Sequence, residues 1–269
     1  MWKRLSALPI IISMIFRNCC NSVSVQVGPE SSAVKKQRGK RDENDFVRHG
    51  QPNYKEDCLT ELGHLQGKAV AKRLADERLD RILSSSCGRA AETAMHIAEM
   101  HGIQVEQLDF MREIAWKSID GTEIPERGHP WKISDNMVAA GENLLQTDWE
   151  ISAYYAKSVF GSEVQRVAKD FDGLMETLGY KREGKFYRVC RSNVDNIVMV
   201  SHGGSSTAVF AHLFNLSAPF VCQTMRPDFT AITVVTFDGE DGQLISPRFE
   251  IMNDARHILG CTVENVFDR

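Results

Sequence analysis

Apolar residues recur at intervals of three and four in two long segments of the chain, residues 60–78 and 163–178. This is the period of an amphipathic helix, so both segments are predicted to be helical. Thr60 can cap the first of them, because its hydroxyl accepts hydrogen bonds from backbone N–H groups. Two further helices are expected over residues 89–101 and 206–214, the earlier one closed by a glycine.

Short apolar runs lie between these helices and predict strands. The runs are Phe46–Val47 and residues 79–83, 105–110, 196–200 and 231–237, with 245–251 as a candidate partner for the last of them. The first run is a difficulty, because only Phe46 and Val47 follow an acidic stretch, so this strand is either very short or atypical. Strands and helices alternate, which predicts an α/β fold with helices on both faces of the sheet.

Residues 114–162 show no clear period. They contain three of the four tryptophans, Trp116, Trp131 and Trp149. We expect a partly helical insertion over the edge of the sheet. Its rings either cover a substrate or belong to ordinary packing.

The chain is expected to divide into a leader or disordered segment, residues 1–43, and one domain, residues 44–269. Residues 5–16 form a mostly apolar run that is too short to span a bilayer. It is typical of a signal peptide or a basic targeting segment, and a leader without a role is the alternative. We expect a cytoplasmic protein, with secretion as the other reading.

Bulk composition excludes some classes of protein. The 269 residues are 42% hydrophobic, which is enough for a sizeable core. The net charge of −4 argues against a nucleic-acid binder with a basic surface. The seven cysteines are odd in number and form no C-x-x-C pair, so free thiols in a reducing compartment are favoured over disulfides or a zinc site.

Two of the eight histidines have an unusual setting. His49 and His202 each follow an apolar segment and precede a glycine. Ligands of open α/β sheets bind beyond the carboxyl ends of strands, so both imidazoles are predicted to face one pocket. The alternative is that both are turn residues. The other six are expected to be surface or core residues: His64, His96, His101, His129, His212 and His257.

Three charged residues complete a candidate phosphate site. Arg48 precedes His49, Arg89 opens a predicted helix, and Glu113 follows a predicted strand. Phosphoryl transfer needs cationic donors around three oxygens and an in-line nucleophile. Arg48, Arg89 and His202 would be the donors, and His49 the nucleophile. Glu113 would protonate the leaving oxygen and then activate water. Neither a cofactor nor a metal is required; surface charges are the alternative reading of Arg89 and Glu113.

The order of these motifs resembles the histidine phosphatase superfamily, in the branch that includes cofactor-dependent phosphoglycerate mutases. The segments that carry the resemblance are Arg48-His49-Gly50, Leu59–Gly63 with Gln66-Gly67, Ser84–Ala94, Arg112-Glu113-Ile114, Ser201–Gly204 and Asn253-Asp254 with His257.

The resemblance implies a phosphoglycerate mutase-like three-layer α/β/α sandwich with a helical insertion over the active site. It implies that His49 is the phosphorylated residue and that Arg89 binds phosphate. Asn53 is a further candidate for the phosphoryl group. The residues that follow the first motif and those that follow Glu113 depart from the mutase pattern, so hydrolysis is favoured over mutase activity.

The expected function is therefore metal-independent hydrolysis of a phosphate monoester through a phosphohistidine. A phosphoglycerate mutase and a catalytically silent scaffold for phosphorylated ligands are the alternatives. The expected partner is a small phosphorylated metabolite or a phosphopeptide, with no nucleic acid and no stable membrane span. Asp170-Phe171-Asp172-Gly173 mimics an aspartyl-phosphate motif, but it lies within a predicted helix and is taken as coincidence.

Overall fold

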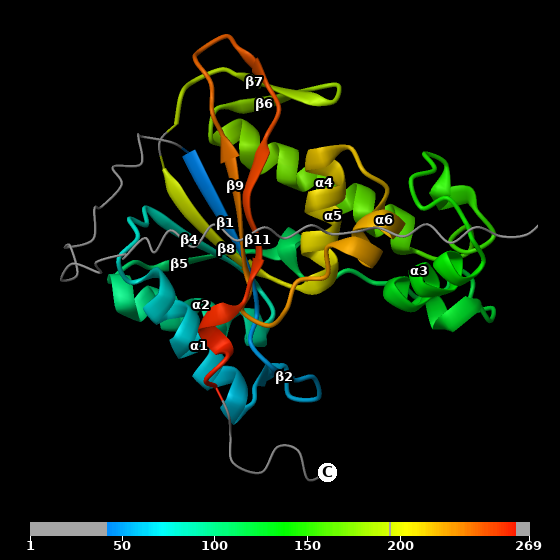
Figure 1. Cartoon of the computed structure of the whole chain (residues 1–269), viewed down its shortest axis with the longest axis horizontal. Coiled ribbons are helices and arrows are strands. Elements are labelled where there is room, and N and C mark those ends of the chain that lie inside the picture. Colours follow the sequence, from blue (N-terminus) through cyan, green and yellow to red (C-terminus); the bar gives the residue numbers. More distant parts are fainter. Residues whose placement is uncertain (1–41, 194, 262–269) are drawn as a thin grey trace, which may run out of the picture. The chain divides into compact units, whose positions relative to one another are not determined.

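The computed structural model describes residues 42–193 and 195–261. A six-stranded sheet with the order β11-β9-β1-β8-β4-β5 forms its centre (Figure 1). The strands are β1 (Asp42–Arg48), β4 (Arg81–Ser85), β5 (Val105–Leu108), β8 (Asn196–Ser201), β9 (Ile232–Phe237) and β11 (Arg248–Asp254). The four strands β1, β8, β4 and β5 run parallel. On the other side of β1, β9 pairs antiparallel with β1 and β11 pairs antiparallel with β9, so β9 alone runs against the other five strands.

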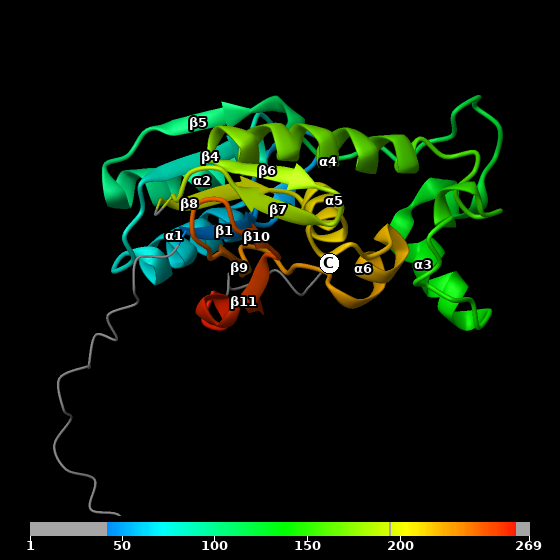
Figure 2. The same ribbon diagram turned by 90° about the horizontal axis from the view of Figure 1, so that it is seen from above.

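Helices cover both faces of this sheet (Figures 1 and 2). They are α1 (Glu61–Leu74), α2 (Gly88–His101), α3 (Pro130–Ala139), α4 (Phe160–Thr177), α5 (Gly203–Phe214) and α6 (Ala218–Thr224). Side chains alternate between the faces of a strand, so neighbours enter different cores. Phe46 packs with residues of α4 and α5, whereas Val47 packs with residues of α1 and α2. The predicted three-layer α/β/α sandwich is confirmed.

The predicted helices form close to their expected positions. Thr60 caps α1 by accepting from the N–H of Gly63, as its hydroxyl suggested. Gly102 closes α2 in the left-handed conformation, with φ of 66°. Helix α5 begins at Gly203 instead of residue 206, which makes His202 its N-cap residue. The Asp170–Gly173 motif lies inside α4 with Phe171 fully buried, as expected of a coincidental match.

Several short elements were not predicted. Pro52–Asn53 (β2) pairs with Cys58–Leu59 (β3), and Tyr180–Glu183 (β6), Phe186–Val189 (β7) and Leu244–Ile245 (β10) form a three-stranded sheet. The insertion contains α3, which packs against α6, and short 3-10 turns. No helix among the described residues is long and apolar enough to cross a membrane. The described cysteines, from Cys58 to Cys261, are all free thiols.

Of the two readings of the first strand, the atypical one holds and the very short one does not. Strand β1 has seven residues and begins at Asp42, so it starts before the predicted domain boundary at residue 43; residues 1–41 lie outside the described part of the chain. Its backbone pairs on both sides, with β8 and with β9. The polar side chains Asp42 and Asn44 are buried and bonded to each other, with Asn44 Nδ2 donating to Asp42 Oδ1 over 3.1 Å. Mutual hydrogen bonding offsets part of their burial cost.

Burial gives Asp42 an unusual protonation equilibrium. Its pKa rises from 3.8 to about 7, mainly through desolvation, while hydrogen bonds from Tyr180 and Asn44 oppose the rise. The folded protein therefore holds a proton that the unfolded chain releases near pH 4, so this residue's contribution to stability falls as pH rises from about 4 to about 7.

Asp42→Asn is expected to remove this pH dependence. The variant should match the wild type near pH 4 and exceed its unfolding free energy at pH 8, by at most about 4 kcal/mol. Urea denaturation at several pH values measures the difference. Asp76→Asn, at an exposed position, is the control. Parallel stability curves for the wild type and Asp42→Asn would contradict the prediction.

Candidate functional site

Each predicted site residue except Asn53 follows the carboxyl end of a parallel strand. Arg48 ends β1 and His49 follows it, Arg89 lies in the first turn of α2 after β4, Glu113 comes after β5, and His202 follows β8. Because these strands are neighbours in the sheet, their carboxyl ends meet at one edge. The imidazole rings of His49 and His202 lie side by side, with centroids 5.0 Å apart.

His49 is held in one tautomer by its surroundings. Its Nδ1 lies 2.7 Å from the carbonyl oxygen of Gly50, so Nδ1 carries the ring proton and donates it there. Burial, with the charges of Arg48 and Arg89, lowers the pKa of His49 to about 3. The ring is therefore neutral at physiological pH and Nε2 keeps its lone pair. The Nε–H of Arg89 points at this lone pair from 3.3 Å.

Arg48 is fixed at one end and open at the other. Its Nη1 donates to the carbonyl of Pro227 over 2.7 Å, and its guanidinium lies 4.2 Å from the ring centre of Phe229. Its buried Nε has no hydrogen-bond partner among the described residues. A buried donor without a partner is costly, and an anion would satisfy it.

Arg89 is oriented by Asp57, a residue to which sequence reasoning gave no role. The Asp57 carboxylate accepts from Arg89 Nη1 and, over 2.8 Å, from the backbone N–H of Gly88 at the start of α2. Gly88 has no side chain, and a Cβ there would lie 2.2 Å from the carbonyl oxygen of Asp57. Asp57 itself is in the left-handed conformation, with φ of 51°. The β2–β3 hairpin thereby fixes the guanidinium of Arg89.

His202 is fully buried, and Ser85 sets its protonation pattern. Ser85 Oγ accepts from the N–H of Cys87 and lies 2.8 Å from His202 Nε2. We assign the hydroxyl proton of Ser85 to Nε2, which places the ring proton of His202 on Nδ1. Nδ1 has no partner within the described residues. Burial, together with His49, Arg89 and Arg48, lowers the pKa of His202 to about 2, so this ring is neutral too.

Glu113 lies over the first turn of α5. Its Oε1 accepts from the backbone N–H groups of Ile114, Gly204 and Ser205 at 3.0–3.2 Å. A Cβ at Gly204 would lie 2.5 Å from this oxygen, so the glycine makes room for the carboxyl group. Burial raises the pKa of Glu113, and the hydrogen bonds and nearby arginines only partly oppose this. A carboxyl group with a raised pKa is suited to donating a proton near neutral pH.

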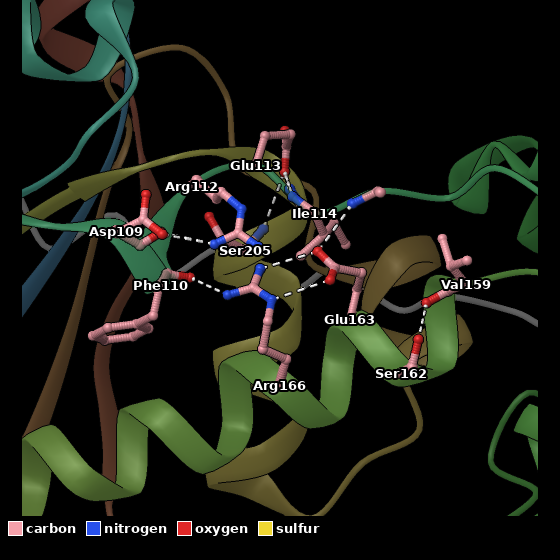
Figure 3. A network of polar contacts seen from close by, with 12 residues as sticks. Asp109, Phe110, Arg112, Glu113, Ile114, Val159, Ser162, Glu163, Arg166 and Ser205 are labelled. Atoms are coloured by element: carbon pink, nitrogen blue, oxygen red, sulfur yellow. Dashed lines mark hydrogen bonds and ion pairs between the residues drawn. The ribbon is translucent and has the colours of Figure 1, made fainter.

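An ion pair on α4 brackets the segment that carries Glu113 (Figure 3). Arg166 and Glu163 pair at 3.0 Å. Arg166 Nη1 donates to the carbonyl of Phe110, before Glu113, and Glu163 accepts from the N–H of Ala115, after it. The backbone on both sides of the carboxyl group is thus tied to one helix.

The segment Asn253-Asp254 with His257 contacts the loop of residues 227–230. Asn253 accepts from the N–H of Asp228 over 2.7 Å, and His257 Nε2 lies 3.1 Å from Thr230 Oγ1. Residues 227–230 include both groups that hold Arg48, so these contacts support the Arg48 side chain from outside.

A cavity of about 610 Å³ opens at this edge of the sheet. Its lining consists of Arg48, Tyr54, Arg89, Glu113, Trp116, His129, Trp131, Gly203, Arg226 and Pro227. His129 was expected to have no special setting, but it lines this cavity. In the described ranges, 42–193 and 195–261, no three His, Cys, Asp or Glu side chains are grouped so that they could hold a metal ion.

The structure does not bring Asn53 to the other site residues. Its Oδ1 accepts from the N–H groups of Lys55 and Glu56 at 3.1 and 3.3 Å, which closes the turn of the β2–β3 hairpin. The side chain is exposed and does not line the cavity. The amide of Asn53, which was expected to face the phosphoryl group, is instead used by a local turn.

These features describe an α/β protein with two neutral histidines and two arginines grouped at the carboxyl edge of its sheet. Residues 45–149 match the family described as the histidine phosphatase superfamily (branch 1). This match supports the resemblance to the superfamily that the motifs indicated.

Known proteins of similar sequence and structure carry phosphatase names. "Putative phosphoserine phosphatase 2" of Hydrogenobacter thermophilus is 24% identical over 209 residues, 74% of this chain and 92% of its own length. A mycobacterial glucosyl-3-phosphoglycerate phosphatase structure has a TM-score of 0.54 at 20% identity, covering 79% of this chain and 98% of that chain. Phosphoserine phosphatase from Entamoeba histolytica, in complex with phosphoserine, has a TM-score of 0.52 at 21% identity, covering 81% and 100%.

Proposed function

We propose that this protein hydrolyses phosphate monoesters through a phosphohistidine at His49, without a metal ion. The observation that carries the proposal is the fixed tautomer of His49. Its Nδ1 donates to the Gly50 carbonyl, so Nε2 keeps a lone pair, which faces the Nε–H of Arg89. The phosphatase names of the similar proteins support the reaction class.

The pocket supplies donors for the three equatorial oxygens of a phosphoryl group. They are the Nε–H of Arg48, the Nδ1–H of His202 and the guanidinium of Arg89. Arg89 occupies the His49 lone pair in the absence of substrate, and an incoming phosphoryl group takes its place. Preorganised donors in a water-poor pocket stabilise the charge that develops during transfer.

In the first step His49 Nε2 forms a bond to phosphorus, and the ester bond from phosphorus to the leaving oxygen breaks. The leaving oxygen takes the proton of Glu113. In the second step water gives a proton to the Glu113 carboxylate and attacks phosphorus. The bond from Nε2 to phosphorus then breaks, which releases phosphate and restores His49.

Turnover in the presence of a chelator tests this proposal. With an aryl phosphate and excess chelator, the rate is expected to equal the rate without chelator, because protein donors replace a metal ion. Brief exposure to substrate followed by denaturation in base should trap a phosphoryl adduct on His49 that acid removes. Chelator-sensitive turnover would contradict metal independence. Rapid turnover with no adduct at His49 would point to a different nucleophile, and no turnover over a wide pH range would favour the silent scaffold.

A further inference from the structure

Three aromatic rings of the insertion form one side of the cavity. We name Trp116, His129 and Trp131 the aromatic wall. The ring centroid of Trp116 lies 5.5 Å from that of His129 and 6.0 Å from that of Trp131. The ring centroids of His129 and Trp131 are 5.4 Å apart. Gly128, with φ of 81°, allows the preceding turn to pack directly on the backbone of Trp116, where a Cβ would lie 1.7 Å from its carbonyl oxygen.

The wall is rigidly placed. Trp131 stands in the first turn of α3 behind Pro130, a residue whose fixed φ suits the start of a helix. The carbonyl oxygen of Trp131 accepts from Ser134 Oγ and from Arg226. The wall is therefore a preformed surface, which reduces the entropy lost when a ligand binds.

We name Arg48, His49, Arg89, Glu113 and His202 the phosphate pocket. The aromatic wall meets this pocket at Gly203. A Cβ at this glycine would lie 3.3 Å from the indole of Trp131 and 3.8 Å from the unpartnered Nε of Arg48. The ring that would cover a leaving group and the donor that would hold a phosphoryl oxygen are thus separated by one residue without a side chain.

The charged groups around the aromatic wall are paired within the protein. Arg226 donates through Nε to the Cys222 carbonyl at 2.8 Å, and through Nη2 to Asp135 at 2.6 Å. Burial lowers the pKa of His129, with Lys132 adding to this effect, so its ring is neutral at pH 7. Among the described lining residues outside the phosphate pocket, Arg226 is the one full charge, and a carboxylate balances it.

We propose that the site selects phosphate monoesters whose alcohol carries a planar, uncharged aromatic ring close to the ester oxygen. This inference rests on the proposed function, since it assigns the leaving group of that reaction. Rigid aromatic faces favour planar rings through offset and edge-to-face contacts beyond the gain from area alone. The cavity volume of about 610 Å³ accommodates a phosphoryl group and a ring of this kind.

Matched substrates test the leaving group. Benzyl phosphate and cyclohexylmethyl phosphate differ in planarity but hardly in size, and phosphoserine carries charges in place of a ring. The wild-type kcat/KM is expected to be about tenfold higher for benzyl phosphate than for cyclohexylmethyl phosphate, and higher still relative to phosphoserine. Equal values for the first two, or a preference for phosphoserine, would overturn the proposal while leaving the phosphatase reaction in place.

Trp131→Leu should remove this preference while keeping an apolar side chain at the position. The expected result is about a tenfold loss of kcat/KM for benzyl phosphate and little change for phosphoserine. Phe186→Leu makes a comparable exchange in β7, outside the cavity, and is expected to leave both values unchanged. An equal loss on every substrate in Trp131→Leu would assign the ring a structural role and overturn the inference.

Binding of unreactive analogues separates this inference from the proposed function. Benzylphosphonate and cyclohexylmethylphosphonate cannot be hydrolysed, and calorimetry on the wild-type protein measures their affinities. A tenfold preference for benzylphosphonate supports the aromatic site whether or not turnover is seen. Equal affinities overturn it. Absence of turnover with every monoester would instead sink the phosphatase proposal alone.

Discussion

Replacing His49 by alanine is expected to abolish phosphate monoester hydrolysis, with kcat reduced on the order of 10⁴-fold or more. The variant lacks the imidazole nitrogen whose lone pair faces the Nε–H of Arg89. His202 cannot substitute, because the Ser85 hydroxyl engages its Nε2 and its Nδ1 carries the ring proton. Steady-state assays with an aryl phosphate measure the effect, provided that product formation is detected to below about one ten-thousandth of the wild-type rate.

The matched control is His64→Ala. His64 is a partly exposed histidine on α1 that contacts His96 and does not line the cavity. It should retain wild-type turnover. Thermal unfolding of both variants checks that the buried site at residue 49 still folds. If folded His49→Ala retained more than about one per cent of the wild-type kcat, phosphate transfer through this histidine would be excluded.

The convergence of the site could be predicted because its residues follow strand ends. His49 and His202 are separated by 153 positions in sequence, yet each follows an apolar run by one intervening residue and precedes a glycine. In a parallel sheet that local setting is enough to place two side chains at one edge. The structure brings them together with Arg48, Arg89 and Glu113, and the roles given to these residues stay predictions.

The full length of the first strand escaped prediction for a physical reason. Periodicity measures side-chain hydrophobicity, whereas β1 is held by backbone pairing to β8 and β9 on its two sides. Asp42 and Asn44 enter the interior because they bond to each other and because Asp42 can hold a proton. These compensations depend on distant contacts such as Tyr180, which no window of sequence contains.

Local hydrogen bonds explain the residues that were misplaced or missed. Asn53 was assigned to phosphate by its position after the first motif, but the hairpin turn uses its acceptor. Asp57 carried no signal of its own, and its role depends on a left-handed conformation that aims it at Arg89 and Gly88. The tryptophans of the insertion were noted, but their assembly into one wall depends on packing across an aperiodic segment.

Replacing Glu113 by glutamine is expected to affect substrates according to their leaving groups. Glutamine keeps the oxygen that accepts from Ile114, Gly204 and Ser205 but has no acidic proton to give. For an alkyl phosphate such as phosphoserine the loss in kcat should be about 10²–10⁴-fold, because the alkoxide needs protonation. For p-nitrophenyl phosphate it should be about tenfold or less, because its phenolate leaves without a proton.

The pH profile gives the second measurement on this variant, because burial raises the pKa of Glu113. Wild-type kcat/KM for an alkyl phosphate should fall as pH rises through that raised value, since the free enzyme loses its acid. The glutamine variant should lack this alkaline limb, while Glu142→Gln, an exposed glutamate of the insertion, should keep the wild-type profile. Equal losses on alkyl and aryl phosphates, or an alkaline limb that persists in Glu113→Gln, would assign proton donation to another group and reduce Glu113 to an anchor for the first turn of α5.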